Sequence, residues 1–150
     1  PQGNIGDRAL FAMGTPEFKN LFGQLGAGDS TSAAEQFSLQ VMCETLDFTA
    51  LHLITGTHAI KEILSQLPSE SKSEIERTVM PSLVATFLSM TKASKHNLTL
   101  DIETTIEEIR SIGANSLNDH VIKFCYVALD EFKKSGNVLY LQLAKQYSVL

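Results

Sequence analysis

The residues from Asp47 to Leu67 form the segment that most restricts the fold. Placed at about 100° per residue, the angular step of an α-helix, their apolar side chains surround nearly the whole circumference. These apolar residues are Phe48, Leu51, Leu53, Ile54, Ile60, Ile63 and Leu64. A helix that is apolar on most sides is buried on most sides. The segment therefore predicts a protein in which other helices surround this one.

The start of the chain carries weaker signals. Residues 1–12 show no sustained period, so we expect them to be extended or poorly ordered. Thr15-Pro16-Glu17 favours a helix start, because Thr caps, Pro fits the first helical position and Glu suits the positive end of the helix dipole. The glycine-rich residues 23–30 predict a linker. We therefore separate a start, residues 1–30, from a helical domain, residues 31–150.

Two capping boxes predict helix starts on either side of the apolar segment. Ser32 with Glu35, and Ser71 with Glu74, have the spacing at which each side chain bonds a free backbone N–H group. Pro81 lies ten residues after Ser71, where the missing donor and the ring should kink or split the helix.

Three further helices are predicted in the last third, after a polar loop at residues 92–100. Their ranges are Asp101 to Gly113, Ser116 to Gly136, and residues 138–147. No stretch shows the alternation of a strand. We expect an all-α, irregular bundle of about six or seven helices.

Composition limits the partners. Asp and Glu outnumber Lys and Arg by 17 to 12, which leaves no overall basic surface for nucleic acid. The sequence has neither an apolar run of about 18 residues nor the order of a signal peptide, so we expect no membrane partner and a cytoplasmic location. Cys43 and Cys125 lie in apolar helical stretches and are expected to be buried thiols. Buried free thiols and a cytoplasmic location both fit a reducing compartment.

Residues 52–58 place two histidines and two threonines inside the most apolar helix. His52 and Thr55 project within about 60° of each other, and Gly56 and Ala59 extend them into a stripe of small residues. His58 points about 120° away from His52, which predicts separate roles. Each histidine is either a core residue with a structural partner or a group for proton transfer.

A second polar group lies at residues 118–123. Asp119 and His120 fall in the first turn of a predicted helix, and Lys123 follows one turn later on the side of His120. Asp119 suits capping. His120 and Lys123 together could bind an anionic oxygen. The alternative for Lys123 is an ordinary solvated surface charge.

Several cofactor motifs are missing from the sequence. It contains no His-x-x-x-His, Glu-x-x-His or Cys-x-x-Cys pattern, so no metal is predicted. It also lacks the Gly-x-Gly-x-x-Gly fingerprint of flavin and dinucleotide domains.

Residues 47–59 (Asp-Phe-Thr-Ala-Leu-His-Leu-Ile-Thr-Gly-Thr-His-Ala) and residues 118–124 (Asn-Asp-His-Val-Ile-Lys-Phe) together resemble the questin oxidase-like family. The resemblance is best over residues 45–150. Members are longer helical proteins, so this chain would be their C-terminal part.

The resemblance implies an oxidoreductase, a monooxygenase of the Baeyer-Villiger type that uses NADPH and molecular oxygen on a polycyclic phenolic ketone in an apolar pocket. By residue type, His52 and His58 would transfer protons beside Thr55, and His120 with Lys123 would hold an oxyanion. The predicted site residues are His52, His58 and His120 for catalysis, and Thr55, Asp119 and Lys123 for substrate binding.

A non-catalytic helical module for interaction or ligand binding is the alternative. The plain amphipathic helices and the lack of a strong catalytic motif favour it. Its partners would be the missing N-terminal part of the same protein or a second copy of the chain.

Overall fold

The computed structural model describes residues 3–24, 30–90 and 103–150, and within these ranges all regular structure is helical. The helices are α1 (Ile5–Met13), α2 (Pro16–Gln24), α3 (Ser30–Thr45), α4 (Phe48–Gln66), α5 (Ser69–Leu88), α6 (Ile106–Asn115), α7 (Asp119–Ser135) and α8 (Leu139–Tyr147). The expected all-α, irregular bundle is confirmed. The described residues form eight helices instead of six or seven.

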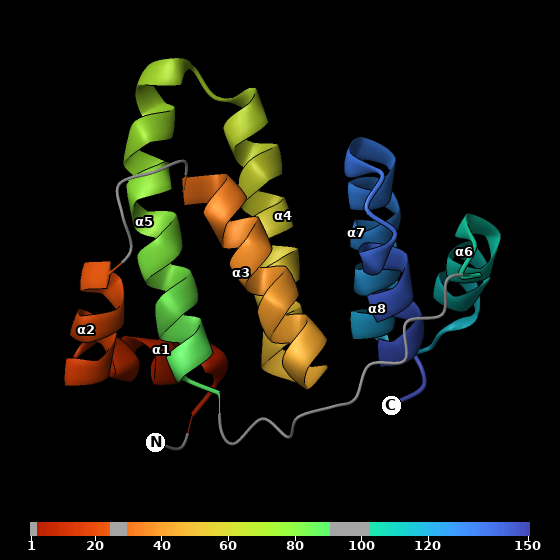
Figure 1. Ribbon diagram of the computed structural model, residues 1–150, viewed down its shortest axis with the longest axis horizontal. Coiled ribbons are helices and arrows are strands. Elements are labelled where there is room, and N and C mark those ends of the chain that lie inside the picture. The colour runs from red at the N-terminus through yellow and green to blue at the C-terminus, as the bar shows by residue number, and fades with distance from the viewer. Residues whose placement is uncertain (1–2, 25–29, 91–102) are drawn as a thin grey trace.

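The helices pack in two groups that meet between α4 and α7. In the first group α3, α4 and α5 pack on one another, while α1 and α2 lie against α5 (Figure 1). In the second group α7 packs against both α6 and α8. The polar residues described below lie where the groups meet.

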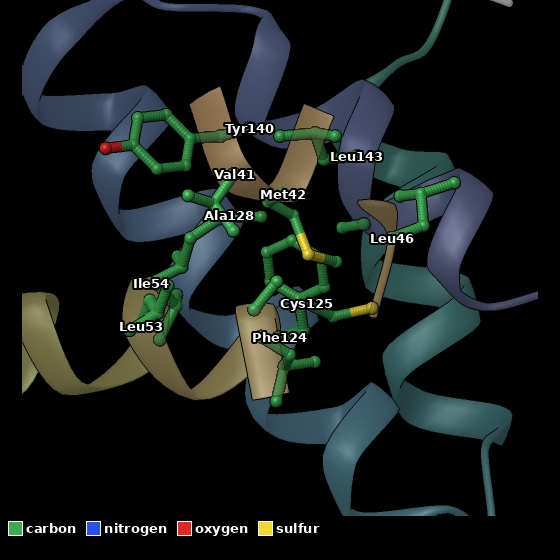
Figure 2. Packing of buried hydrophobic residues seen from close by; sticks show 14 of the residues in the cluster. Val41, Met42, Leu46, Leu53, Ile54, Phe124, Cys125, Ala128, Tyr140 and Leu143 are labelled. Carbon is green, nitrogen blue, oxygen red and sulfur yellow. The ribbon is translucent and has the colours of Figure 1, made fainter. Parts of the chain in front are cut away.

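A single apolar cluster joins the two groups. Met42 of α3, Leu53 of α4, Phe124 of α7 and Leu143 of α8 are all fully buried within it. Figure 2 shows these side chains together, with the ring of Tyr140 at the edge and its hydroxyl oxygen turned away from the other labelled residues. The edge of this core is therefore where buried polar groups begin.

Helix α4 matches the expected apolar segment. Asp47 caps it by accepting a hydrogen bond of 2.6 Å from the backbone N–H of Thr49. Eight of its residues are buried, but Phe48 is 46% exposed and Ile63 is 53% exposed. One flank of α4 is therefore exposed, although its apolar side chains predicted burial on most sides.

The first half of the chain differs from expectation at three helix starts. Residues 1–12 were expected to lack regular structure, but α1 begins after a capping box between Asn4 and Asp7. Helices α3 and α5 begin at Ser30 and Ser69, so Ser32 and Ser71 lie inside the helices instead of just before them. Only local spacing supported those two boxes.

Pro81 does not split its helix, because α5 runs unbroken through it. The packing of α5 against four other helices stabilises the helical path that the missing N–H weakens. Most of the expected linker at residues 23–30 and the whole loop at residues 92–100 lie outside the described residues.

The last third is close to expectation. Thr105 caps α6, which begins later than Asp101, itself outside the described residues, and Gly113 lies inside α6 instead of ending it. A Cβ atom on Gly113 would lie 3.0 Å from the Cβ of Cys125, so this glycine permits close packing of α6 on α7. Gly136 ends α7 in the left-handed conformation, φ 70°, as predicted.

None of the described helices is long and apolar enough to cross a membrane. Cys43 and Cys125 are free thiols, half-buried and buried respectively. Burial raises the pKa of both thiols, and for Cys43 the nearby Glu44 carboxylate raises the pKa further.

Candidate acid–base site

His58 of α4 and Glu131 of α7 form a buried pair. The His58 Nδ1 lies 2.8 Å from the Glu131 Oε1, and their side chains are 7% and 2% exposed. A carboxylate only accepts hydrogen bonds, so the Nδ1 carries the shared proton. This bond fixes the ring and leaves the Nε2 on the other side.

A chain of hydrogen bonds extends from Glu131 into the edge of the core. Lys61 Nζ donates to Glu131 Oε2 at 2.7 Å and to Glu35 Oε2 at 3.0 Å. The Tyr140 hydroxyl donates to the other oxygen of Glu35 at 2.6 Å. Residues of α3, α4, α7 and α8 thus form one continuous network.

The network perturbs its own members. Burial, and then the hydrogen bond to Glu35, raise the pKa of Tyr140 far above its usual value. Burial acts to lower the pKa of Lys61, but its hydrogen bonds to Glu131 and Glu35 outweigh burial and raise it. Lys61 is therefore held as a cation beside two carboxylates.

A small cavity of about 10 Å³ lies beside the network, lined by Glu35, Ser38, Ile54, Thr57, His58, Lys61, Glu131 and Tyr140. Ser38 and Thr57, two of its lining residues, share a hydroxyl contact of 3.0 Å. That volume holds about one water molecule. The cavity has room for a water molecule that relays a proton, but not for an organic substrate.

The outer side of His58 faces two more carboxylates. Its Nε2 lies 3.9 Å from Asp130 Oδ2, beyond hydrogen-bond distance. Lys134 Nζ contacts Asp130 at 2.6 Å and also pairs with Glu62. The hydrogen bond from Lys134 lowers the pKa of Asp130, while Asp130 and then Glu62 raise that of Lys134. Tyr126 meets the His58 ring edge-on, with centroids 6.0 Å apart.

A groove between α6 and α7 begins at this outer side. It encloses about 460 Å³ and is lined by Ile106, Arg110, Tyr126, Leu129, Asp130, Phe132 and Lys133. Ligand sites occupy about 300–1,000 Å³, with mostly apolar walls and a few polar groups. Asp130 and Tyr126 each belong to the groove wall and contact His58.

His52 and His120 lie together in a separate aromatic cluster with Phe48. Ring centroids are 4.6 Å apart for Phe48 and His52, and 5.5 Å apart for the two histidines. The His52 Nδ1 is 2.8 Å from the Phe48 carbonyl oxygen. Thr55 Oγ1 donates to the Leu51 carbonyl oxygen.

His120 and Lys123 converge on Asp119. The His120 Nδ1 and the Lys123 Nζ each lie 3.0 Å from an oxygen of that carboxylate. The hydrogen bond from Lys123 lowers the pKa of Asp119. Asn118, not Asp119, caps α7. His120 and Lys123, which were predicted to bind a substrate oxyanion, are thus both paired with the carboxylate of Asp119.

The predicted residues therefore fall into two places: His52 meets His120 near Asp119 and Lys123, whereas His58 stands apart. Glu35, Lys61, Asp130, Glu131 and Tyr140 were missed. A signal for Glu131 exists, because it continues the buried helical stripe of Phe124 and Ala128 at spacings of four and three. No sequence pattern pairs it with His58.

No protein-family model, curated protein or solved structure matches this chain.

Proposed function

We propose that this chain carries the acid–base centre of a questin oxidase-like oxygenase that acts on a polycyclic phenolic ketone. The observation that carries the proposal is the buried His58–Glu131 pair, in which one ring nitrogen is fixed and the other is turned outward. A histidine held by a carboxylate in this way is the usual arrangement for proton transfer. A reducing compartment such as the cytoplasm suits the two free thiols.

The groove between α6 and α7 is the proposed substrate site. Leu129, Phe132 and Tyr126 offer apolar and aromatic surface to a flat ring system. Arg110 and Lys133 offer positive charge to a phenolate.

Protons would pass between substrate and His58 by way of Asp130, which lines the groove and lies 3.9 Å from the Nε2. Baeyer-Villiger oxygenation places one atom of O₂ beside the ketone carbon and releases the other as water, with two electrons from NADPH. The His58–Asp130 pair would take a proton as the peroxy adduct forms and return it as the adduct collapses.

The lysines of the ion pairs described above are not available to the phosphates of NADPH. Lys61, Lys123 and Lys134 are each bonded to carboxylates. The helix starts of α4 and α7 carry Asp47 and Asp119, which repel a pyrophosphate. We therefore assign no residue and no step of this chain to NADPH.

The proposal is tested by oxygen uptake with a hydroxyanthraquinone and NADPH. We expect His58→Gln to lower kcat by about 100-fold or more, because proton transfer by a positioned side chain contributes that much. His52→Gln, on the same helix, is the matched control and should change kcat by less than about threefold. Equal rates for wild type and a folded His58→Gln variant would contradict the proposal.

A helical module that binds a second copy of the chain is the second candidate. It is favoured by the open stripe on α4, where a Cβ on Gly56 would meet nothing within 4 Å and Ala59 is exposed. Close helix contacts use such small residues. Light scattering that shows a monomer at high protein concentration would contradict this candidate.

A further inference from the structure

We infer that His58, Glu62 and Asp130 form a binding site for a divalent transition metal such as Zn²⁺. One ligand atom from each side chain lies within 4.8 Å of the other two. His58 and Glu62 come from α4 and Asp130 from α7, so no single stretch of sequence contains all three ligands. Histidine nitrogen and carboxylate oxygen are both ligand types that zinc takes.

The orientation of His58 is the observation that sets this group apart from an ordinary acidic cluster. The imidazole is 7% exposed, and its Nδ1 is held by Glu131 at 2.8 Å. Among the described residues no hydrogen bond reaches its Nε2, which faces Asp130 at 3.9 Å. Metal-bound histidines donate their other ring N–H to a carboxylate, a backbone carbonyl or water, and a carboxylate there fixes the ring and strengthens the ligand.

Exposure rises outward from the histidine and gives the ion an entry path. The side chains of His58, Asp130 and Glu62 are 7%, 29% and 49% exposed. Tetrahedral ligands with bonds of about 2.0 Å lie about 3.3 Å apart. The site must therefore contract, and the two partly exposed carboxylates are the side chains free to move. A fourth position remains open to water.

Lys134 holds the place of the cation in this structure. Its ammonium group pairs with both Glu62 and Asp130, the same carboxylates that would bind the metal. A divalent ion brings twice that charge to the two carboxylates, and the exposed lysine can swing into solvent. Metal binding is thus an exchange of one cation for another.

The inference does not require the proposed oxygenation. Zn²⁺ binding needs only three side chains, whereas turnover needs substrate, oxygen and reductant. A bound ion would occupy the Nε2 lone pair that proton transfer needs, so the two uses of His58 exclude each other. Zn²⁺ should then inhibit turnover if both proposals hold, while binding is measured without any substrate.

The test is calorimetric titration of the metal-free protein with Zn²⁺, repeated with Co²⁺ and read by absorption. We expect one site per chain and a Co²⁺ spectrum without a thiolate charge-transfer band, which separates the site from both cysteines. Glu62→Gln, at an exposed position, should weaken binding by about tenfold or more. His58→Gln should abolish it, whereas the control His52→Gln should bind as wild type does.

Lys134 supplies the sharpest pair of variants. Lys134→Met removes the competing ammonium and should tighten Zn²⁺ binding by about tenfold, the equivalent of about 1.4 kcal/mol. Lys133→Met removes a neighbouring charge that acts on Asp130 more weakly than Lys134 does and forms no ion pair with it, and should leave the affinity within about twofold.

Two results would overturn the inference. Equal Zn²⁺ affinity in wild type, Glu62→Gln and His58→Gln would place the ion elsewhere on the protein. Absence of binding even in Lys134→Met would show that the cluster is an ion-pair network and nothing more.

Discussion

Glu131 is the residue on which the electrostatics of the site depend. Its carboxylate is 2% exposed, and Lys61 and His58 each bond one of its oxygens. An isolated ionised carboxylate is very costly to bury, so these two partners make the position tolerable. Removing one partner of such a pair costs more than the pair contributes, because the other charge stays buried.

Lys61→Met should therefore lower the free energy of unfolding by about 2–4 kcal/mol, a value reduced because Lys61 itself is 26% exposed. Lys123→Met is the control, since the Lys123–Asp119 pair is exposed to solvent and such surface pairs contribute little to stability. Urea denaturation at neutral pH measures both. Equal losses in the two variants would show that the buried network has no special energetic role.

Tyr140 predicts how stability depends on alkaline pH. Its pKa is raised in the folded protein, chiefly by burial, so the phenol stays protonated while that of the unfolded chain ionises near pH 10. The unfolded state then loses a proton that the folded state keeps, and stability falls as pH rises above about 10. Below that pH the group makes no difference to the slope.

Tyr140→Phe should flatten this alkaline loss, as measured by urea denaturation at several pH values from about 9 to 11. The variant also breaks the hydrogen bond to Glu35, so a smaller, pH-independent loss of about 1 kcal/mol is expected at neutral pH. A slope identical to that of wild type would mean that Tyr140 ionises as freely in the folded protein as in the unfolded one.

The same residues show what sequence reasoning reaches at this scale. His58 was identifiable because a histidine on the most apolar helix needs a partner. Its partner Glu131 lies 73 positions later, and only tertiary packing joins them. The separation of His58 from His52 followed from helix geometry, whereas the meeting of His52 with His120 required the packing of α4 against α7.

Helix packing depends on a few positions without side chains. Gly113 brings α6 against Cys125 of α7, while Gly56 of α4 has open space around it. The two glycines sit in similar helical backbones but in opposite surroundings. A matched pair of substitutions separates packing from helix propensity.

Gly113→Val should destabilise the protein by about 1–3 kcal/mol, because a Cβ at 3.0 Å from Cys125 Cβ already forces a shift. Gly56→Ala should stabilise it by up to about 1 kcal/mol, since alanine is the better helix former and meets nothing within 4 Å. Thermal unfolding checks both. Loss of stability in both variants would mean that α4 is covered at Gly56.

Sequence patterns predicted helices better than helix starts. The apolar segment from Asp47 and the helix end at Gly136 were placed correctly, because helical periodicity and a terminal glycine are local signals. The boxes at Ser32 and Ser71 failed, since α3 and α5 extend two residues further toward their N-termini. Capping-box spacing alone therefore does not decide where these helices begin.

At the scale of the whole molecule, the two helix groups share one apolar core and one polar network at its edge. The all-α class followed from periodicity, but the contact between α4 and α7 did not, because no local signal specifies which faces meet. That contact creates the acid–base pair, while the groove beside it is formed by α6 and α7. The candidate site is thus a product of tertiary structure.

The proton position on His58 tests this account most directly, by ¹⁵N–¹H correlation of the histidine rings in the folded protein. The account predicts that the neutral His58 ring carries its proton on Nδ1, held by Glu131, with Nε2 unprotonated. Glu131→Gln should remove this preference. A wild-type ring protonated on Nε2 would contradict the buried pair and everything proposed from it.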